Sequence, residues 1–509
     1  MVSKVKSCAL LGIDGCIVDV ETDISNGIPN FDVVGLGDMA VRESRERVRA
    51  AIKNSGMDFP VRRITINLAP ASLRKGGSMY DVSIAVGILV ASDIIKNTDL
   101  SSYMFLGELS LDGSIKPIDG IISMVCCAAA NNIKNIFVPE TNSDEAAVFS
   151  SVNILPVKCL NDIIKHLNGD SIILSYFTNV DSIFMHNTKD SLDFCDVKGQ
   201  ASLKRAMEVA ACGSHNMLMM GSPGSGKTML AKRLPSILPD MTFEEAVQIT
   251  KIHSISGLLP RNTSLLTQRP FRNPHHTISA ISLVGGGKQC KPGEVSLAHY
   301  GVLFLDEFPE FEKSAIEVLR QPLEDGEITI SRVNGSITYP ARTTLICAAN
   351  PCKCGYYLEQ TNKCSCTPKM VQQYLGKLSQ PLLDRIDIHT EIHPVRYEDL
   401  NNAVKEETSA VIRERVNRAR KLQNDRYRKL GIYSNSELTP TLIRKYCELD
   451  RSTSCLLKMA FERLGLSARA YDRILKVART IADMDDSEKI KSEHIAEAIQ
   501  YRSMDRIKI

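Results

Sequence analysis

An apolar run at 217–220 leads into Gly-x-x-x-x-Gly-Lys-Thr at 221–228, and a helical pattern follows. This order of strand, glycine-rich loop and helix is the context that a phosphate-binding loop requires. Glycine lets the backbone pass close to phosphates, and the following helix directs its positive end at them. The flanking strand and helix disfavour the alternative, a chance glycine-rich turn. The segment therefore predicts a nucleotide-binding α/β unit.

The residue types in this loop have separate predicted roles. Lys227 would reach the β- and γ-phosphates, and the Thr228 hydroxyl would bind Mg²⁺. The backbone N–H groups of the loop would cradle the phosphates. The residues of this cradle are Gly221, Ser222, Pro223, Gly224, Ser225, Gly226, Lys227 and Thr228.

A second apolar run, 302–305, ends in the acidic pair Asp306 and Glu307. A buried parallel strand would deliver both carboxylates to the edge of the sheet where the phosphate loop lies. Asp306 would hold Mg²⁺, and Glu307 would polarise the attacking water. A helix-capping pair is the alternative. Together the two motifs predict a nucleoside triphosphatase that uses ATP.

Length and composition limit the remaining possibilities. The chain has 509 residues, which at about 150 residues per domain suggests three domains. A formal charge of +3 excludes a histone-like polycation, although a local basic patch remains possible. The start is not a secretory signal, and the most apolar stretch, 82–91, is half of the ~20 residues of a membrane span. We therefore expect a cytoplasmic protein without membrane contact, whose 15 cysteines are mostly reduced.

The pattern along the chain predicts three domains. Residues 1–168 are expected to form an α/β domain, 169–192 a linker, 193–395 the ATPase core, and 396–509 a helical domain. In the first domain, strands are expected at 16–20, 63–67 and 135–139, and helices at 40–55 and 81–92.

Four cysteines cluster in the core at 352–366, in the pattern Cys-x-Cys, nine residues, Cys-x-Cys. Four thiolates are the ligand set of a structural Zn²⁺ site, and a metal would supply the folding energy that the polar connection lacks. Reduced surface thiols or a redox disulfide pair are the alternatives. The candidate ligands are Cys352, Cys354, Cys364 and Cys366.

The core resembles the AAA+ ATPases of the magnesium-chelatase-like branch, and more narrowly the YifB/ComM family. The resemblance extends over essentially the whole chain. Its motifs are Asp196-Val-Lys-Gly-Gln, Arg269-Pro-Phe-Arg-Asn-Pro-His-His-Thr-Ile-Ser, Gly285-Gly-Gly, Pro292-Gly-Glu-Val-Ser-Leu-Ala-His, Leu319-Arg-Gln-Pro-Leu-Glu-Asp-Gly, Ala349-Asn-Pro-Cys and Leu382-Leu-Asp-Arg-Ile-Asp. It implies an AAA+ phosphate-loop core with an all-α lid, and marks 251–289 as the helix-2 insert, where His275 and His276 are expected to be structural or pore-lining.

The resemblance assigns three further roles. Asn350 is similar to the sensor-1 residue that orients water, with a turn-initiating Asn as the alternative. Arg385 is similar to the arginine finger, with a salt bridge to Asp384 or Asp387 as the alternative. Arg469 resembles the sensor-2 arginine of the lid, and Arg473, one turn later, competes with it. A finger supplied in trans implies a homo-oligomer, expected to be a hexamer.

Residues 1–168 resemble the proteolytic domain of Lon proteases, an S5-like α/β fold. The likeness lies in the segments 68–81 and 107–120. A Lon-type protease needs a serine nucleophile and a lysine base. This chain has Met79 where the resemblance places the serine, with Ser78 offset, and Ile122 where it places the lysine. We therefore expect a domain without protease activity.

The sequence indicates the binding partner of the protein less directly than its ATPase activity. Asn334-Gly335 predicts a hairpin over 327–339, whose Arg332 is a candidate phosphate contact if the hairpin is not an ordinary surface one. The basic helical run 411–429 suits nucleic acid, although a solvated charged face is the alternative. Since ComM-like proteins are associated with DNA branch migration, the first hypothesis is an ATPase motor on single-stranded or branched DNA in recombination or natural transformation. The second is a chelatase-type or chaperone-like AAA+ protein that remodels a protein partner.

Overall fold

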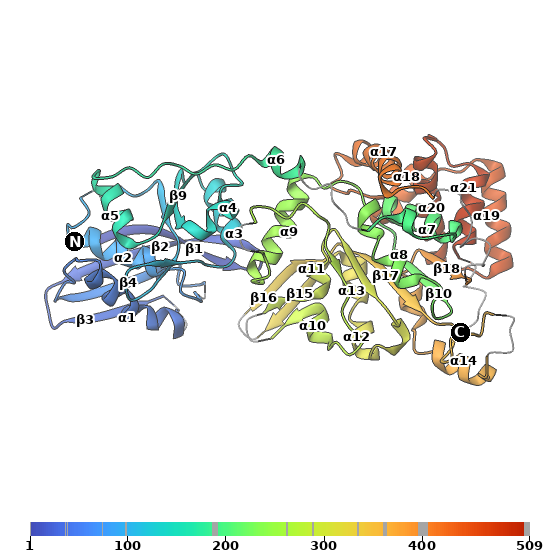
Figure 1. The fold of residues 1–509 in the computed structure, drawn as a ribbon, viewed down its shortest axis with the longest axis horizontal. Helices are drawn as coiled ribbons and strands as arrows, with labels where there is room; N and C mark the ends of the chain where they lie inside the picture. Colours follow the sequence, from blue (N-terminus) through green and yellow to red (C-terminus); the bar gives the residue numbers. More distant parts are fainter. Residues whose placement is uncertain are drawn as a thin grey trace. The chain divides into compact units, whose positions relative to one another are not determined.

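The computed structural model describes residues 2–35, 37, 39–73, 75–96, 99–185, 192–260, 263–287, 290–332, 335–359, 364–394 and 406–502. The chain forms two compact units (Figure 1). The N-terminal unit consists of Met1–His186 with Phe243–Thr267. The second unit, which we call the ATPase unit after the activity predicted for it, consists of Asn187–Thr242 with Gln268–Ile509.

A seven-stranded mixed sheet forms the centre of the N-terminal unit, in the order β3-β4-β2-β1-β5-β8-β9. β2 pairs antiparallel with β1 and β4, whereas β3, β5, β8 and β9 pair parallel with their neighbours. The strands are β1 (Val2–Leu11), β2 (Asp14–Ser25), β3 (Asn30–Val34), β4 (Arg63–Ala69), β5 (Tyr103–Phe105), β8 (Asn135–Pro139) and β9 (Asn153–Val157), with a separate pair, β6 (Glu108–Leu109) and β7 (Ile115–Lys116). The three predicted strands of this domain are confirmed.

Helices cover this sheet, and the most apolar of them is the most buried. Every residue of α2 (Asp81–Ala91) is buried, because α2 packs on β1 and β2. The apolar stretch is therefore a core helix, and within the described residues no helix has the length and hydropathy to cross a membrane. The other helices are α1 (Met39–Asn54), α3 (Ile121–Ala130), α4 (Ser143–Ala146), α5 (Leu160–Asn168) and α6 (Val180–Met185), the last within the expected linker.

One helix belongs to the N-terminal unit although the sequence boundaries put it in the ATPase core. α9 (Phe243–Ile255) packs against α3. The Phe243 ring meets Phe149 edge-on at 6.1 Å, and Ser254 Oγ donates to the buried Glu145 over 2.5 Å. The expected insert therefore divides: its first part, to Thr267, lies with the N-terminal unit because its apolar and polar partners are there.

The ATPase unit has a parallel five-stranded sheet in the order β11-β14-β17-β10-β18. Its strands are β11 (Phe271–Arg272), β14 (Val302–Leu305), β17 (Thr344–Ala349), β10 (Met217–Gly221) and β18 (Ile388–Ile392). β10, β14 and β17 are buried throughout, which confirms the α/β core with buried parallel strands. Around it lie α7 (Ala201–Gly213), α8 (Lys227–Ala231), α10 (Ala280–Val284), α11 (Glu294–Leu297), α12 (Lys313–Glu317), α13 (Arg320–Asp325), α14 (Pro368–Leu375) and α15 (Gln380–Leu383), with the short strands β12 (Gly285–Gly286) and β13 (Lys291–Pro292).

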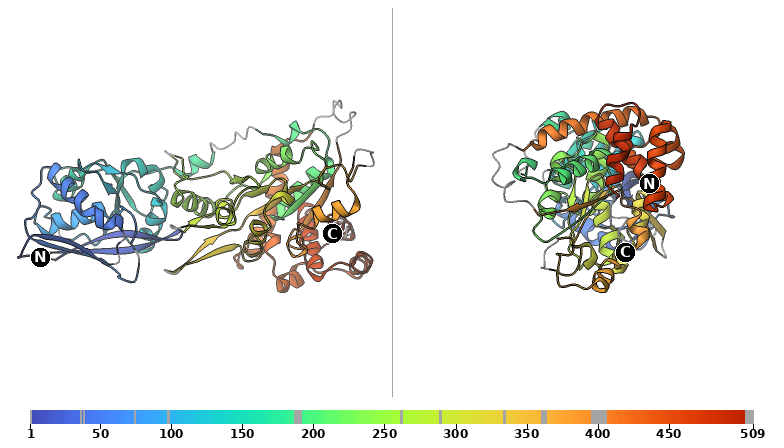
Figure 2. Two further views of the ribbon diagram at one scale, coloured as in Figure 1. Left: turned by 90° about the horizontal axis from the view of Figure 1, so that it is seen from below. Right: turned by 90° about the vertical axis from the view of Figure 1, so that its right-hand side faces the viewer.

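The C-terminal part is helical, as predicted. Its helices gather into one bundle, orange to red in both figures (Figures 1 and 2). They share an apolar core with α7 and β10. The helices are α17 (Ser409–Tyr427), α18 (Pro440–Tyr446), α19 (Arg451–Leu464), α20 (Ala468–Met484) and α21 (Ser492–Gln500).

The predicted hairpin also forms. β15 (Glu327–Arg332) pairs antiparallel with β16 (Gly335–Pro340), and Arg332 is opposite Gly335 in the register. The loop residue Asn334 and the Arg332 side chain lie outside the described part of the chain.

Candidate functional site

The glycine-rich loop joins the end of β10 to the start of α8. Gly224 and Gly226 have φ angles of +76° and +90°, in the left-handed region where glycine is favoured. A Cβ at Gly221 would lie 2.6 Å from the backbone oxygen of Ile392 on the adjacent strand. The sequence thus needs glycine here for the turn and for close packing of β10 on β18.

Lys227 begins α8 with its ammonium turned into the loop. Its Nζ donates to the carbonyl oxygens of Gly221 and Ser222 over 2.7 and 2.8 Å. Nζ also lies 3.3 Å from Asn350 Oδ1, at the end of β17. Burial lowers the pKa of the Lys227 ammonium below its usual value. The charge is therefore poorly solvated, and an anion at this loop would stabilise it.

Thr228 and Asp306 meet at the same edge of the sheet. The Thr228 Oγ1 donates to Asp306 Oδ2 over 2.7 Å, which joins the start of α8 to the end of β14. A hydroxyl and a carboxylate, both oxygen ligands, suit Mg²⁺. The structure therefore brings together Lys227, Thr228, Asp306 and Asn350. The first and last of these are 123 positions apart in the sequence.

Glu307 has an unusual backbone and an unexpected neighbour. Its φ is +51°, a left-handed conformation that costs a non-glycine residue on the order of 1–3 kcal/mol. The side chain is exposed, and its Oε2 lies 3.3 Å from His276 Nδ1. Sequence reasoning did not predict this pairing. The available signal is that His276 follows β11, a strand that is parallel to β14 and ends at the same edge.

Arg385 follows α15 and is only 8% exposed. Its Nη2 lies 2.5 Å from Glu324 Oε1, and its Nη1 donates to the Pro381 carbonyl oxygen. A local salt bridge is therefore present, but with Glu324 of α13 and not with either neighbouring aspartate. An arginine finger at this position has to exchange Glu324 for the phosphate of another subunit.

The two candidate sensor-2 arginines differ in their surroundings. Arg469 is exposed in the first turn of α20. Arg473 Nη1 lies 2.9 Å from Oδ1 of Asp387, whose side chain is fully buried. Arg473 is therefore held by a buried carboxylate, whereas the Arg469 side chain is exposed to solvent.

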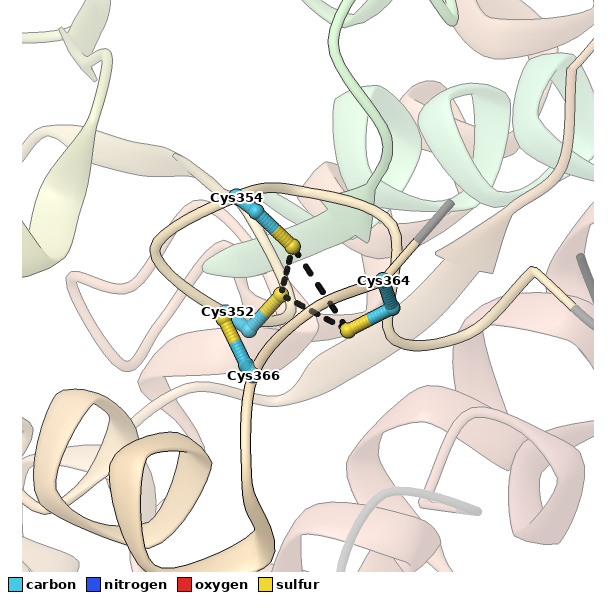
Figure 3. Close-up of side chains that lie close together, drawn as sticks. All are labelled: Cys352, Cys354, Cys364 and Cys366. Atoms are coloured by element: carbon cyan, nitrogen blue, oxygen red, sulfur yellow. Dashed lines mark hydrogen bonds between the residues drawn. The ribbon is translucent and has the colours of Figure 1, made fainter. Parts of the chain in front are cut away.

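The four cysteines lie close together (Figure 3). Their sulfur atoms all lie within 4.8 Å of one another, with Cys352 Sγ 3.2 Å from Cys354 Sγ and 3.9 Å from Cys364 Sγ. Four sulfurs at 2.3 Å from a tetrahedral zinc would be about 3.8 Å apart, so the arrangement fits Zn²⁺. Within the described residues, this is the one such group of His, Cys, Asp or Glu side chains.

The basic helix α17 uses much of its charge inside the unit. Arg415 Nε pairs with Glu208 at 2.7 Å, and Arg426 Nη2 pairs with the buried Asp483 at 2.5 Å. Arg420 donates to the Ser214 hydroxyl over 2.8 Å. Arg418 and Lys421 of α17 are exposed, and Arg418 lies 3.6 Å from the exposed Asp486; the exposed Arg428 and Lys429 follow the end of the helix.

The N-terminal unit has no serine–lysine pair at the two positions, 79 and 122, where the resemblance to Lon proteases places one. Ser78 donates to Glu108 Oε2. Ile122 is fully buried in α3, where its backbone N–H donates to Glu145. Lys75 is buried too, and its ammonium donates to the Pro70 carbonyl oxygen.

Three family models match the chain. The model described as "Magnesium chelatase, subunit ChlI" matches residues 193–400, which include the phosphate loop, Asp306 and Asn350. "Subunit ChlI of Mg-chelatase" matches residues 20–142, and "Magnesium chelatase, subunit ChlI C-terminal" matches residues 406–502.

Relatives match over the full length. The competence protein ComM of Haemophilus influenzae is 42% identical over 507 residues, which cover 99% of this chain and 98% of that protein. The YifB protein of Escherichia coli is 42% identical over 511 residues, with 100% and 98% covered. The magnesium-chelatase 38 kDa subunit of Rhodobacter capsulatus is 25% identical over 235 residues, with 42% of this chain and 63% of that protein covered.

Proposed function

This chain belongs to the magnesium-chelatase-like family that includes ComM and YifB, and on that premise we propose that it is a Mg²⁺-dependent ATPase that acts on DNA. The observation that carries the ATPase part is the meeting of Lys227, Thr228, Asp306 and Asn350 at one sheet edge. In this proposal the loop 221–228 and Lys227 bind the phosphates, and Thr228 and Asp306 hold Mg²⁺. When bound there, Mg²⁺ would neutralise charge that develops on the phosphates.

The chain's own residues then carry the hydrolysis step. Glu307 accepts a proton from the attacking water, and Asn350 orients that water against the γ-phosphate. Arg469 contacts the phosphates from the lid, and Arg385 of one subunit contacts those of the next. These assignments imply a ring of identical chains, which we propose to be a hexamer.

Two substitutions test the ATPase. Lys227→Ala is expected to abolish ATP binding, measured with a fluorescent ATP analogue. Glu307→Gln is expected to retain binding and to lower the hydrolysis rate by about 100-fold or more, the usual contribution of a general base. A Glu307→Gln protein that hydrolyses ATP at the wild-type rate would remove the assigned base.

DNA is the proposed substrate of the motor. The Haemophilus relative is named a competence protein, and this supports a role for the chain in transformation or recombination. We propose that the protein drives branch migration or strand translocation. The test compares ATP hydrolysis without DNA, with single-stranded DNA and with a four-way junction. Stimulation by DNA is expected, and a rate that no DNA changes would contradict the proposal.

A protein partner is the second candidate function, since the Rhodobacter relative is a magnesium-chelatase subunit. It would be favoured if no DNA altered the hydrolysis rate. We further propose that the N-terminal unit has no protease activity, because the Lon-like lysine position holds the buried Ile122. ATP-stimulated peptide cleavage that is lost in Ser78→Ala would overturn this. Finally, we propose that the four cysteines bind structural Zn²⁺.

A further inference from the structure

The four-cysteine cluster packs against the base of the phosphate loop. Met220, next to last in β10, lies in one buried apolar cluster with Cys352 and with Val371 of α14. The partly buried residues Cys354, Cys364, Cys366 and Leu358 pack on the same cluster. The strand that leads into the phosphate loop, β10, therefore packs against the cysteine cluster through Met220.

A second contact reaches the loop itself. Gly355 has a φ of +88°, and a Cβ there would lie 2.4 Å from Cδ and 2.7 Å from Cγ of Pro223. A proline ring is closed onto its own backbone and cannot rotate away. The turn after Cys354 is therefore packed against the ring of Pro223 in the loop, and this close approach requires glycine.

A third connection runs through the strand that precedes the cysteines. Asn350 directly follows β17, two residues before Cys352, and its Oδ1 lies 3.3 Å from Lys227 Nζ. Displacement of Cys352 would therefore move a side chain that contacts the phosphate-binding lysine. The cysteine cluster reaches the nucleotide site at three points: Met220, Pro223 and Lys227.

We propose that Zn²⁺ held by these four cysteines is a structural support of the ATP site, which fixes Pro223 and Asn350 in the phosphate-binding arrangement. Only a few apolar residues, such as Cys352 and Leu358, pack around these cysteines in the described part of the chain, so bonds to a metal would supply much of the energy that orders the two Cys-x-Cys pairs. Without zinc, Gly355 no longer holds Pro223, and the loop loses the geometry that a phosphate needs. This inference rests on the proposed ATP binding.

The first experiment removes the metal from the full-length protein. Wild type is expected to contain one zinc per chain by elemental analysis, and chelation is expected to weaken binding of a fluorescent ATP analogue by about tenfold or more, with recovery when zinc is restored. The double variant Cys364→Ser/Cys366→Ser is expected to lack zinc and to bind ATP as weakly as the chelated protein. The control is Cys455→Ser, at the exposed cysteine of α19, which is expected to keep both zinc and affinity.

The second experiment keeps the metal and breaks the contact. Gly355→Ala is expected to retain zinc and to weaken ATP binding by about tenfold or more, because the new Cβ pushes Pro223 away. Its matched control is Gly56→Ala, where φ is +80° but nothing lies within 4 Å of a Cβ. Zinc content and circular dichroism report whether each variant is folded.

The outcomes separate the inference from the function on which it rests. If wild type binds ATP and Lys227→Ala does not, the ATP site stands whatever the zinc experiments give. Wild type without stoichiometric zinc, zinc-free protein with unchanged ATP affinity, or zinc-loaded Gly355→Ala with wild-type affinity would each overturn the support role. If Gly355→Ala loses its zinc, the chelation experiment alone decides.

Discussion

A buried carboxylate, Asp387, ties the ATPase core to its helical lid. It is 1% exposed and accepts from His215 Nδ1 at 3.1 Å, while Arg473 of α20 lies 2.9 Å from its other oxygen. Burial alone would raise the pKa of Asp387, but Arg473 and His215 outweigh it, so the pKa lies below its usual value. Asp387 is therefore ionised and depends on Arg473 for compensation.

Two single substitutions separate structural from nucleotide-binding arginines in α20. Arg473→Ala leaves the buried Asp387 charge without its cationic partner, and we expect a loss of about 3 kcal/mol of stability. Arg469→Ala removes an exposed side chain, so the melting temperature should stay within a degree or two of wild type while ATP hydrolysis falls. Thermal unfolding and ATPase rates measure the two effects. A stable, inactive Arg473→Ala with a fully active Arg469→Ala would reverse the sensor-2 assignment.

At the scale of elements, a buried carboxyl group, that of Glu145, joins α9 to the rest of the N-terminal unit. Glu145 is 6% exposed and accepts from the Ser254 hydroxyl of α9 over 2.5 Å. Burial raises the pKa of Glu145 to about 7, although Ser254 and the backbone of Ile122 act in the opposite direction. The folded state therefore holds a proton that the unfolded chain releases near its ordinary pKa.

This raised pKa gives a signed pH dependence. Stability from Glu145 is fully present below the ordinary pKa of 4.5 and is lost as the pH rises through about 7. Glu145→Gln keeps an acceptor for Ser254 without the ionisation. We expect it to raise the melting temperature relative to wild type at pH 8 and to change it little at pH 5, with up to about 3 kcal/mol at stake. An equal effect at both pH values would contradict the assignment.

The same scale shows what the sequence could predict. The phosphate loop, the buried parallel strands and the hairpin follow from local patterns, and the structure has them. The attachment of α9 does not, because it depends on partners such as Phe149 and Glu145 about 100 positions away. The ion pairs of α17 could not be predicted either. In the sequence Arg415 and Arg426 have the pattern of surface charges, and only the fold places Glu208 and Asp483 beside them.

The exposed face of α17 remains testable as a DNA contact. Arg418→Glu with Lys421→Glu changes two exposed cations and leaves the buried pairs intact. We expect at least about tenfold weaker DNA binding at low salt, and a salt dependence reduced by about two phosphate contacts. Arg444→Glu with Lys445→Glu, an exposed basic pair on α18, is the matched control. Equal losses in both double variants would indicate a general charge effect and not a site on α17.

At the scale of the whole molecule, the chain passes between its two units three times, since Phe243–Thr267 leaves the ATPase unit and returns to it. α9 is thus joined at both ends to the unit that carries the phosphate loop, while its side chains pack within the N-terminal unit. Any nucleotide-dependent movement of the segments that flank α9 would therefore act on the N-terminal unit through two covalent connections. Two domains joined by a single linker would have only one such covalent connection.

The proposed assembly into a ring gives the last prediction. Arg385 is paired with Glu324 within its own chain, so it can contact a nucleotide of a neighbouring subunit only after that ion pair opens. Arg385→Ala and Lys227→Ala should each be inactive alone. When the two are mixed, some interfaces combine an intact loop from one subunit with an intact arginine from the next, and partial ATPase activity should return. Glu324→Gln, which frees Arg385, should lower the protein concentration needed for activity. If mixing restores nothing although the chains co-assemble by light scattering, Arg385 does not act in trans, and the Glu324 pair is then purely structural.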